Sequence, residues 1–335
     1  MTAKLTLMEH IVVKVASELE LEARWHIFAK RTEATEDKFK PKVRAAFTKQ
    51  EKAVFRAMKG KPVPDTSDAE KTAQVGDDVV YKGRICEIIK IPDNYPIITI
   101  RWESDHPEWE SAVTAVPPSD IVLLKASDEA EAAAETYVDG VFKPATWQVP
   151  FQTLALPFVT EAFMEAGAAA FDEVGIEAAF NVTNARAKKI LEERVFKFAK
   201  EVNETTQKRL RVALAKGFDA GESIPELSKR VADVFEISRG SITDRIARTE
   251  IVGASNQGTF QGYVESDVVD TKVWIDSRDA RVRTDPHNHR IDGQERKLQA
   301  KFSNGLKHPH DPDGEAGNVI NCRCSHMAGK LKEAA

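Results

Sequence analysis

Residues 186–216, RAKKILEERVFKFAKEVNETTQKRLRVALAK, carry apolar side chains at intervals of three and four residues. These apolar positions are Ile190, Leu191, Val195, Phe198, Val202, Leu210, Val212 and Leu214. Because an α-helix has about 3.6 residues per turn, this spacing predicts a long helix with one buried face. Gly217 and Gly221 mark its end. The sequence therefore predicts a fold built mainly from helices.

The same periodicity extends to both sides of this helix. Residues 158–180 form a preceding amphipathic stretch, and residues 242–264 form the last clear one. Between them, Ser223-Ile224-Pro225-Glu226 reads as a capping box that opens a short helix ending near Phe235. We therefore assign residues 158–265 to one helical domain.

The N-terminal region, residues 1–64, is also predicted to be helical. Apolar residues recur at helical spacing over residues 5–59, and Pro62 and Pro64 prevent continuation. Pro41 lies inside this stretch, and we expect it to interrupt the helix. The region is therefore predicted to form N-terminal helices rather than a single one.

Residues 73–125 show a different pattern, with four or five short runs of alternating or β-branched residues separated by turn signals. The run Gly76-Asp77-Asp78-Val79-Val80-Tyr81-Lys82-Gly83 is similar to the start of an SH3-like barrel. Residues 126–157, rich in Ala and Glu and then punctuated by Pro144 and Pro150, read as a linker that could include an exposed helix. The fold class is therefore α+β, mainly α-helical with an inserted small SH3-like β-barrel.

Composition limits the classes of function. The chain has 335 residues and a net charge of −5, but residues 61–182 hold 8 Lys and Arg against 22 Asp and Glu, so the flanking regions are basic. Basic flanks could lie near nucleic acid. We find no apolar run approaching the ~20 residues that span a bilayer and no signal peptide. We therefore expect a chain made in the cytoplasm, with no membrane partner.

The last part of the chain, residues 266–335, is loop-rich and poor in apolar residues, so we expect an additional constraint to hold it together. Five of the eight histidines fall in this part, at positions 287, 289, 308, 310 and 326, with two of the three cysteines, Cys322 and Cys324. Thiolate and imidazole ligands suit tetrahedral zinc. The alternative is that both cysteines are buried apolar residues and the histidines lie in surface loops.

An ordered set of short motifs in this region resembles the Mu F-like phage head morphogenesis family, whose members are minor head or minor capsid proteins. The motifs are Arg248-Thr249-Glu250, Asn256, Trp274, Arg283, His289, Asp292-Gly293-Gln294, Phe302, Pro309-His310-Asp311-Pro312 and Val319-Ile320-Asn321-Cys322-Arg323-Cys324. The resemblance covers about a quarter of the chain firmly, from Ile246 onward, and residues 266–335 form its C-terminal module. It departs from the family at His310, where glycine is common, and at Ala316, where proline is common.

The departure at His310 makes His308 and His310 weaker ligand candidates than His289, Cys322 and Cys324. The fourth zinc ligand stays open between His326, His287 and Asp292. Two further sets of motif residues have structural interpretations. Arg248 and Asn256 share one helical face and could hydrogen-bond the irregular C-terminal loop. Asp292 and Gly293 favour a turn in which the glycine has a positive φ, and Asn321 belongs to the final motif.

The resemblance implies a structural virion protein and no enzyme. It implies a place inside the head near the portal, after assembly in the host cytoplasm. The implied partners are the portal protein, capsid or scaffolding proteins and phage DNA, with roles in head morphogenesis and in DNA packaging or ejection. Two alternatives remain. The sequence His287-Asn288-His289 would suit a metal-dependent nuclease, although residues 295–320 offer only a weak, Pro- and Gly-broken stretch for the following helix that such nucleases need. The basic helices could instead form a DNA-binding scaffold of the virion.

Overall fold

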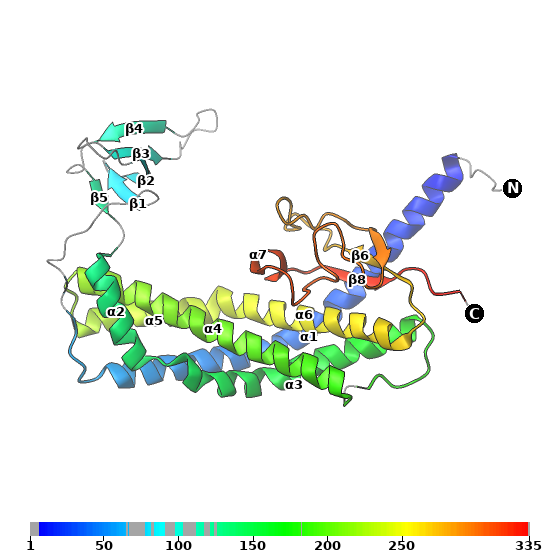
Figure 1. Cartoon of the computed structure of the whole chain (residues 1–335), viewed down its shortest axis with the longest axis horizontal. Coiled ribbons are helices and arrows are strands. Elements are labelled where there is room, and N and C mark those ends of the chain that lie inside the picture. The colour runs from blue at the N-terminus through cyan, green and yellow to red at the C-terminus, as the bar shows by residue number, and fades with distance from the viewer. Residues whose placement is uncertain are drawn as a thin grey trace. The chain divides into compact units, whose positions relative to one another are not determined.

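The computed structural model divides into two compact units, and Figure 1 shows the helices and strands along the chain. The backbone is described at residues 7–64, 66, 78–81, 84–90, 98–102, 112–116, 121–123, 126–181 and 183–333, and the side chains at 18–64, 66, 126–181 and 183–333. Unit 1 comprises Met1–Lys49, Ala145–Asn203 and Ile237–Ala335, and unit 2 comprises Gln50–Pro144 and Glu204–Glu236. Each unit is assembled from segments far apart in the sequence.

Helices account for most of the described residues, as the sequence predicts. They are α1 (Leu7–Met58), α2 (Asp128–Val141), α3 (Pro144–Glu173), α4 (Ala185–Asp219), α5 (Ile224–Ile237), the π-helical turn η2 (Ser238–Ile242), α6 (Thr243–Ser266) and α7 (Ala316–Val319). The strands are β1 (Asp78–Tyr81), β2 (Arg84–Lys90), β3 (Ile98–Trp102), β4 (Ala112–Val116), β5 (Ile121–Leu123), β6 (Thr271–Ile275), β7 (Glu295–Lys297) and β8 (Ser325–Ala328). The α+β class is confirmed.

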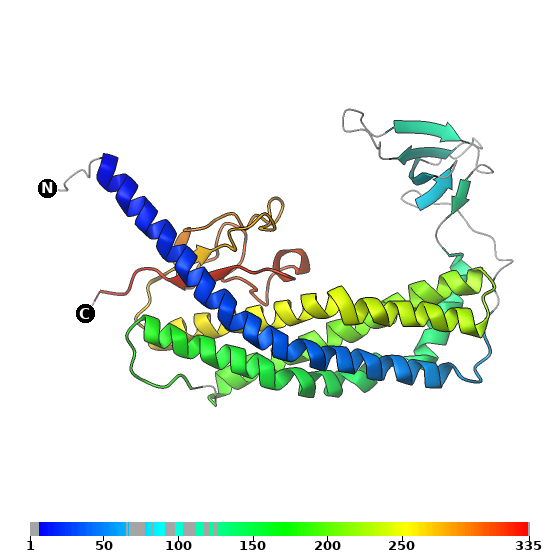
Figure 2. The same cartoon turned by 180° about the vertical axis from the view of Figure 1, so that it is seen from behind.

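In unit 1, parts of α1, α3, α4 and α6 lie side by side (Figures 1 and 2). Aromatic side chains fill the space between them, and the Phe151 ring lies 5.8 Å from Phe47 and 6.0 Å from Phe198. A Cβ added at Gly258 would come within 2.2 Å of the carbonyl oxygen of Phe163. Glycine at this position therefore allows α6 to pack closely against α3.

Two predictions about proline are wrong. Pro41 does not divide the N-terminal region, because α1 continues through it as one helix. A proline inside a helix removes a hydrogen bond at a cost of ~3 kcal/mol, but Phe39 and Val43 on either side are fully buried. Pro144 starts α3 and Pro150 lies inside it, so the two prolines expected to punctuate a linker belong to a helix. Proline suits the first position of a helix, because its missing N–H would have no partner there.

The segment 126–157, predicted to be a linker, is largely helical. In unit 2, Ser127 caps α2 by accepting a hydrogen bond from the amide of Ala130. Tyr137 and Val138 are buried on the inner face of α2, and the Tyr137 ring lies 5.3 Å from that of Phe218. An Ala- and Glu-rich composition is therefore compatible with a packed helix whose small side chains allow close contact.

The inserted β region is a five-stranded antiparallel sheet in the order β4-β3-β2-β1-β5. β5 returns to pair with β1, with Val79 opposite Leu123. Among the described strand residues no pairing joins β4 to β5, so the sheet is open and the predicted closed barrel is not confirmed. The remainder of residues 73–125 lies outside the described residues.

The C-terminal module of unit 1 contains a three-stranded antiparallel sheet in the order β7-β6-β8. Mostly irregular chain connects its strands. β6 carries Trp274, which is fully buried. The core of the C-terminal module is small and consists of Trp274, Phe302, Leu306, Cys322 and Cys324. Ile291 and Val319 pack against it. Both cysteines of the final motif are thus part of the core.

One helix among the described residues, α3, is long and apolar enough to cross a membrane by length and composition. The sequence predicted no apolar run of this length, so this expectation is corrected for α3, which contains three prolines. Phe151, Val159 and Phe163 of α3 are fully buried against neighbouring residues of unit 1. The core of unit 1 therefore covers part of this helix, and 44% of its most apolar stretch is buried.

Candidate metal centre

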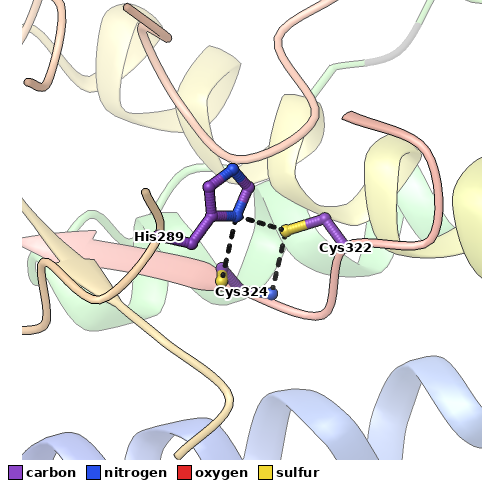
Figure 3. Close-up of side chains that lie close together, drawn as sticks. All are labelled: His289, Cys322 and Cys324. Carbon is purple, nitrogen blue, oxygen red and sulfur yellow. Dashed lines mark hydrogen bonds between the residues drawn. The ribbon is translucent and has the colours of Figure 1, made fainter. Parts of the chain in front are cut away.

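His289, Cys322 and Cys324 converge in the core of the C-terminal module (Figure 3). Their ligand atoms all lie within 4.8 Å of one another. The Nδ1 atom of His289 lies 3.3 Å from Sγ of Cys322 and 3.6 Å from Sγ of Cys324. All three residues are buried. The structure therefore brings together three residues that the sequence analysis singled out.

These distances suit a tetrahedral metal ion. With Zn–S bonds of about 2.3 Å and a Zn–N bond of about 2.0 Å, tetrahedral geometry separates sulfur from nitrogen by roughly 3.5 Å. The two observed N···S distances bracket this value. In addition, the backbone amide of Cys324 donates a hydrogen bond of 3.4 Å to Sγ of Cys322. An amide donor at this position stabilises negative charge on the sulfur.

Asn318 fixes the tautomer of His289. Its Nδ2 atom donates to the carbonyl oxygen of Asn304 at 2.9 Å, which identifies Oδ1 as the atom that lies 2.7 Å from Nε2 of His289. Because an amide oxygen can only accept, Nε2 must carry the proton. In the neutral ring, Nδ1 then presents its lone pair to the two sulfurs, which is the state that binds a metal ion.

The two thiols differ electrostatically. Burial raises the pKa of the Cys322 thiol, but hydrogen bonds with Cys324, His289 and His310 outweigh burial and hold this pKa well below its ordinary value. Burial and the neighbouring Cys322 sulfur raise the pKa of Cys324 well above its ordinary value. Cys322 is therefore the thiol that ionises first.

Helix α6 anchors the loop that carries both cysteines. Nδ2 of Asn256, which is fully buried, donates to the carbonyl oxygen of Cys324 at 3.0 Å, as predicted. Arg248 donates instead to the side chain of Asn321 at 3.0 Å, not to the backbone. The hydroxyl of Thr249 accepts from the amide of Asn321 at 3.0 Å. Asn321 has a φ of +61°, so these contacts hold an otherwise unfavourable backbone conformation.

Three other side chains bind carbonyl groups of the same loop. Nε2 of His310 lies 2.9 Å from the carbonyl oxygen of Cys322. Arg283 donates to the carbonyl oxygen of Ile320, and the indole of Trp25 in α1 donates to that of Arg323 at 3.1 Å. The loop has no regular strand partners for these carbonyls, and side chains replace them.

His326 does not join the centre, although it is only two residues from Cys324. Its Nδ1 atom lies 3.2 Å from Oδ1 of Asn256, and its ring stacks on that of His308 at 5.9 Å. Burial lowers the pKa of His326 well below its ordinary value, so the ring is neutral. Asn256 thus binds His326 and the cysteine loop at once, which holds the imidazole away from the two sulfurs.

The other candidates for a fourth ligand also lie elsewhere. Asp292 accepts from the amide of Asp276 at 3.0 Å and pairs with Arg278, and Gly293 has the expected positive φ, +75°. His287 lies 4.0 Å from Glu315. In the part of the chain that the structure describes, the group within 4.8 Å contains three ligands.

Lys272 is a structural residue that the sequence analysis missed. Its side chain is fully buried, and Nζ donates to the carbonyl oxygens of Lys297, Leu298 and Ala300 at 2.9, 2.5 and 2.7 Å. Burial lowers the pKa of Lys272 to about 8, so the ammonium remains mostly charged at neutral pH. All three of its protons have acceptors. A lysine within a strand normally suggests a solvated face, so residue type gave no signal of this role.

Comparison with known proteins identifies the region that carries the centre. Residues 208–327 match the family described as phage Mu protein F like protein. Protein YqbB of Bacillus subtilis (strain 168), described as uncharacterized, is 23% identical over 195 residues, which cover 56% of this chain and 63% of YqbB. This chain therefore matches less than two thirds of that relative's length. No solved structure gives a significant match. The family match confirms the predicted resemblance, and the phage Mu F-like region of this chain contains every residue of the candidate centre.

Proposed function

We propose that this chain is a minor head protein of a tailed phage that assembles next to the portal and acts in head morphogenesis. The family match at residues 208–327 carries this proposal, because a phage Mu F-like region indicates a head morphogenesis protein and a place in the virion. The portal protein and capsid or scaffolding proteins would be its partners. Contact with phage DNA would link it to DNA packaging or ejection.

The proposed role is structural and not enzymatic. The candidate centre is buried, and the polar groups around it mostly bind the backbone of the module. His289 uses Nε2 for Asn318 and directs Nδ1 toward two sulfurs, and this geometry gives the ring a role as ligand. A histidine that activates water needs a free nitrogen facing a substrate. These contacts therefore favour a structural virion protein over the nuclease alternative.

Zinc is proposed as the ion held by His289, Cys322 and Cys324. Two thiolates and an imidazole are typical zinc ligands, and their spacing fits tetrahedral geometry. The ion would join residue 289 to a loop more than thirty residues later in a module whose apolar core is small. Because such a site is absent in the unfolded chain, metal binding would stabilise the folded module.

The function is tested by co-expressing the chain with the portal protein of the same phage. We expect the two to co-purify and the purified chain to leave DNA uncut in the presence of magnesium, manganese or zinc. DNA cleavage that is abolished in His289→Ala would contradict the structural role. Failure to bind portal protein in both purified and co-expressed samples would contradict the proposed location.

The metal is tested by elemental analysis of protein prepared without added zinc. We expect about one zinc per chain in the wild type, from a single three-ligand group. Cys322→Ser should lose the metal, whereas the matched variant Cys86→Ser, in β2, should keep it. Equal zinc content in both variants would show that the ion is bound elsewhere.

A further inference from the structure

A second feature of the C-terminal module is a pocket that opens beside the candidate centre. It has a volume of about 180 Å³ and is lined by Arg248, Arg281, Arg283 and Arg323, together with the three residues of the centre. No carboxylate side chain is among the described residues that line it. Four positively charged residues around so small a space repel one another, and a bound anion would reduce this repulsion.

Neighbouring acidic groups balance only part of this charge. Asp279 pairs with both Arg323, at 2.5 Å, and Arg281, at 3.5 Å. Glu36 approaches Arg248 at 3.8 Å. Arg283 has no carboxylate partner among the described ion pairs and donates to backbone carbonyls instead. Glu33 lines an adjoining cavity together with Arg248, Arg281 and Arg323. Three carboxylates therefore lie near the four arginines, which leaves an excess of one positive charge.

The metal centre does not account for this excess. Two thiolates would cancel the charge of a divalent ion, so a zinc centre with a neutral histidine needs no counter-charge. Arg281 also has donors to spare, because its side chain is 72% exposed and its described ion pair is the long contact to Asp279. The planar guanidinium donates pairs of parallel hydrogen bonds to tetrahedral and planar oxyanions.

We propose that this arginine-lined pocket binds a phosphate group. A phosphate carries enough negative charge to balance the arginines, and several acceptor oxygens match several guanidinium forks. The pocket, about 180 Å³ in volume, is large enough for one such oxyanion. The source is either free phosphate or a phosphodiester of a nucleic-acid backbone. None of the four arginines belongs to the proposed zinc ligand set, so phosphate and zinc would be held by different side chains.

The test is a calorimetric titration of the full chain with inorganic phosphate, comparing Arg281→Gln with Arg290→Gln. Both variants remove one positive charge from the C-terminal module, but Arg290 is exposed and does not line the pocket. Loss of one charge-assisted contact should weaken phosphate binding about tenfold in Arg281→Gln. Arg290→Gln should bind as the wild type does. Absence of phosphate binding, or equal weakening in both variants, would overturn the proposal.

A short DNA duplex distinguishes the two sources. Duplex binding that is displaced by inorganic phosphate and weakened in Arg281→Gln identifies a backbone phosphodiester as the source. Phosphate binding that the duplex does not displace identifies free phosphate, and both results support the site. If a peptide rich in Asp and Glu binds through Arg281 while phosphate does not, the pocket recognises a protein carboxylate and the proposal is wrong. Portal binding is measured separately, so its failure would leave this result unaffected.

Discussion

Asn318 controls which nitrogen of His289 is available to a metal ion. Its side chain is held by Asn304 and accepts the Nε2 proton, so the lone pair of Nδ1 faces the sulfurs. Mutation of a residue that orients a histidine ligand in this way typically lowers metal affinity by about 10- to 100-fold. We predict that Asn318→Ala lowers zinc affinity by about tenfold or more. Competition with a chromophoric chelator measures the change.

The control for this variant is Asn288→Ala, in the same loop. Asn288 is exposed and accepts only a local hydrogen bond from the amide of Arg290. The Asn288→Ala variant should keep its zinc affinity within about twofold of the wild type. If Asn318→Ala and Asn288→Ala bind zinc equally well, the inferred tautomer has no role in binding.

Lys272 is a second residue whose substitution should strongly lower the free energy of unfolding. Lys272→Met keeps most of the buried volume but leaves three carbonyl groups without their donor. Because unsatisfied buried polar groups are costly, we predict a loss of about 3 kcal/mol in the free energy of unfolding. Lys297→Met is the matched control, since that side chain is exposed and its pair with Asp270 contributes less than about 1 kcal/mol. Urea unfolding measures the free energy of unfolding of both variants. Equal losses in Lys272→Met and Lys297→Met would refute the role of Lys272.

His308 gives the module a pH dependence. Burial lowers its pKa to about 4, against about 6.5 for an exposed histidine. The groups that face it are Phe260, His326, Asp311, Arg194 and His310. Below pH 6.5 the unfolded chain therefore binds a proton at His308, whereas the folded chain does not until about pH 4. Stability is lost as the pH falls from 6.5 towards 4.

The size of this effect can be isolated by substitution. We predict that the wild type loses up to about 1.4 kcal/mol per pH unit from this histidine alone. His308→Gln, whose side chain does not titrate, should show a shallower loss between pH 6.5 and pH 5. Parallel unfolding curves at several pH values provide the comparison, and identical slopes would exclude His308 as the cause. Any pH effect from metal release is common to both proteins.

Residue types in the sequence predicted the centre only in part. Cys322, Cys324 and His289 were identified because thiols and imidazoles are the ligands of zinc, and the structure brings them together. His326 was predicted from its proximity to Cys324, but its position depends on Asn256 and His308, which lie far away in the sequence. Tertiary contacts of this kind leave no local pattern to read.

At the scale of elements, helical periodicity was the most informative signal. The stripe that predicted α4 is largely buried at Leu191, Phe198 and Leu214, although Val212 is 53% exposed. Proline was the least informative signal, because packing on both sides of Pro41 outweighs its local cost. Secondary structure was therefore predicted well where burial follows the period and poorly where tertiary packing opposes a local preference.

The C-terminal module should depend on metal more than the helices do. Its apolar core is small, and the centre joins two of its loops, whereas the helices of unit 1 are packed by aromatic side chains. We predict that chelation increases hydrogen exchange in residues 270–333 while α3 and α6 stay protected. Hydrogen exchange followed by mass spectrometry resolves the two regions. Equal protection of the module with and without chelator would show that hydrogen bonds from Asn256 and Lys272 are sufficient.

At the scale of the whole molecule, the region that matches the family includes parts of both units. Residues 208–327, which match the phage Mu F-like family, run from unit 2 into unit 1 and end in the candidate centre. The five-stranded sheet of unit 2 lies outside that match. Family resemblance therefore supports a function for the C-terminal part of the chain.

We propose that this chain is a structural component of the phage head. Quantitative mass spectrometry of purified virions of the phage that encodes it tests this claim. We predict that the chain is present at a low, fixed ratio to the portal protein and stays with the head after tails are removed. Absence of the chain from purified virions, when it is present in the infected cells, would contradict the claim.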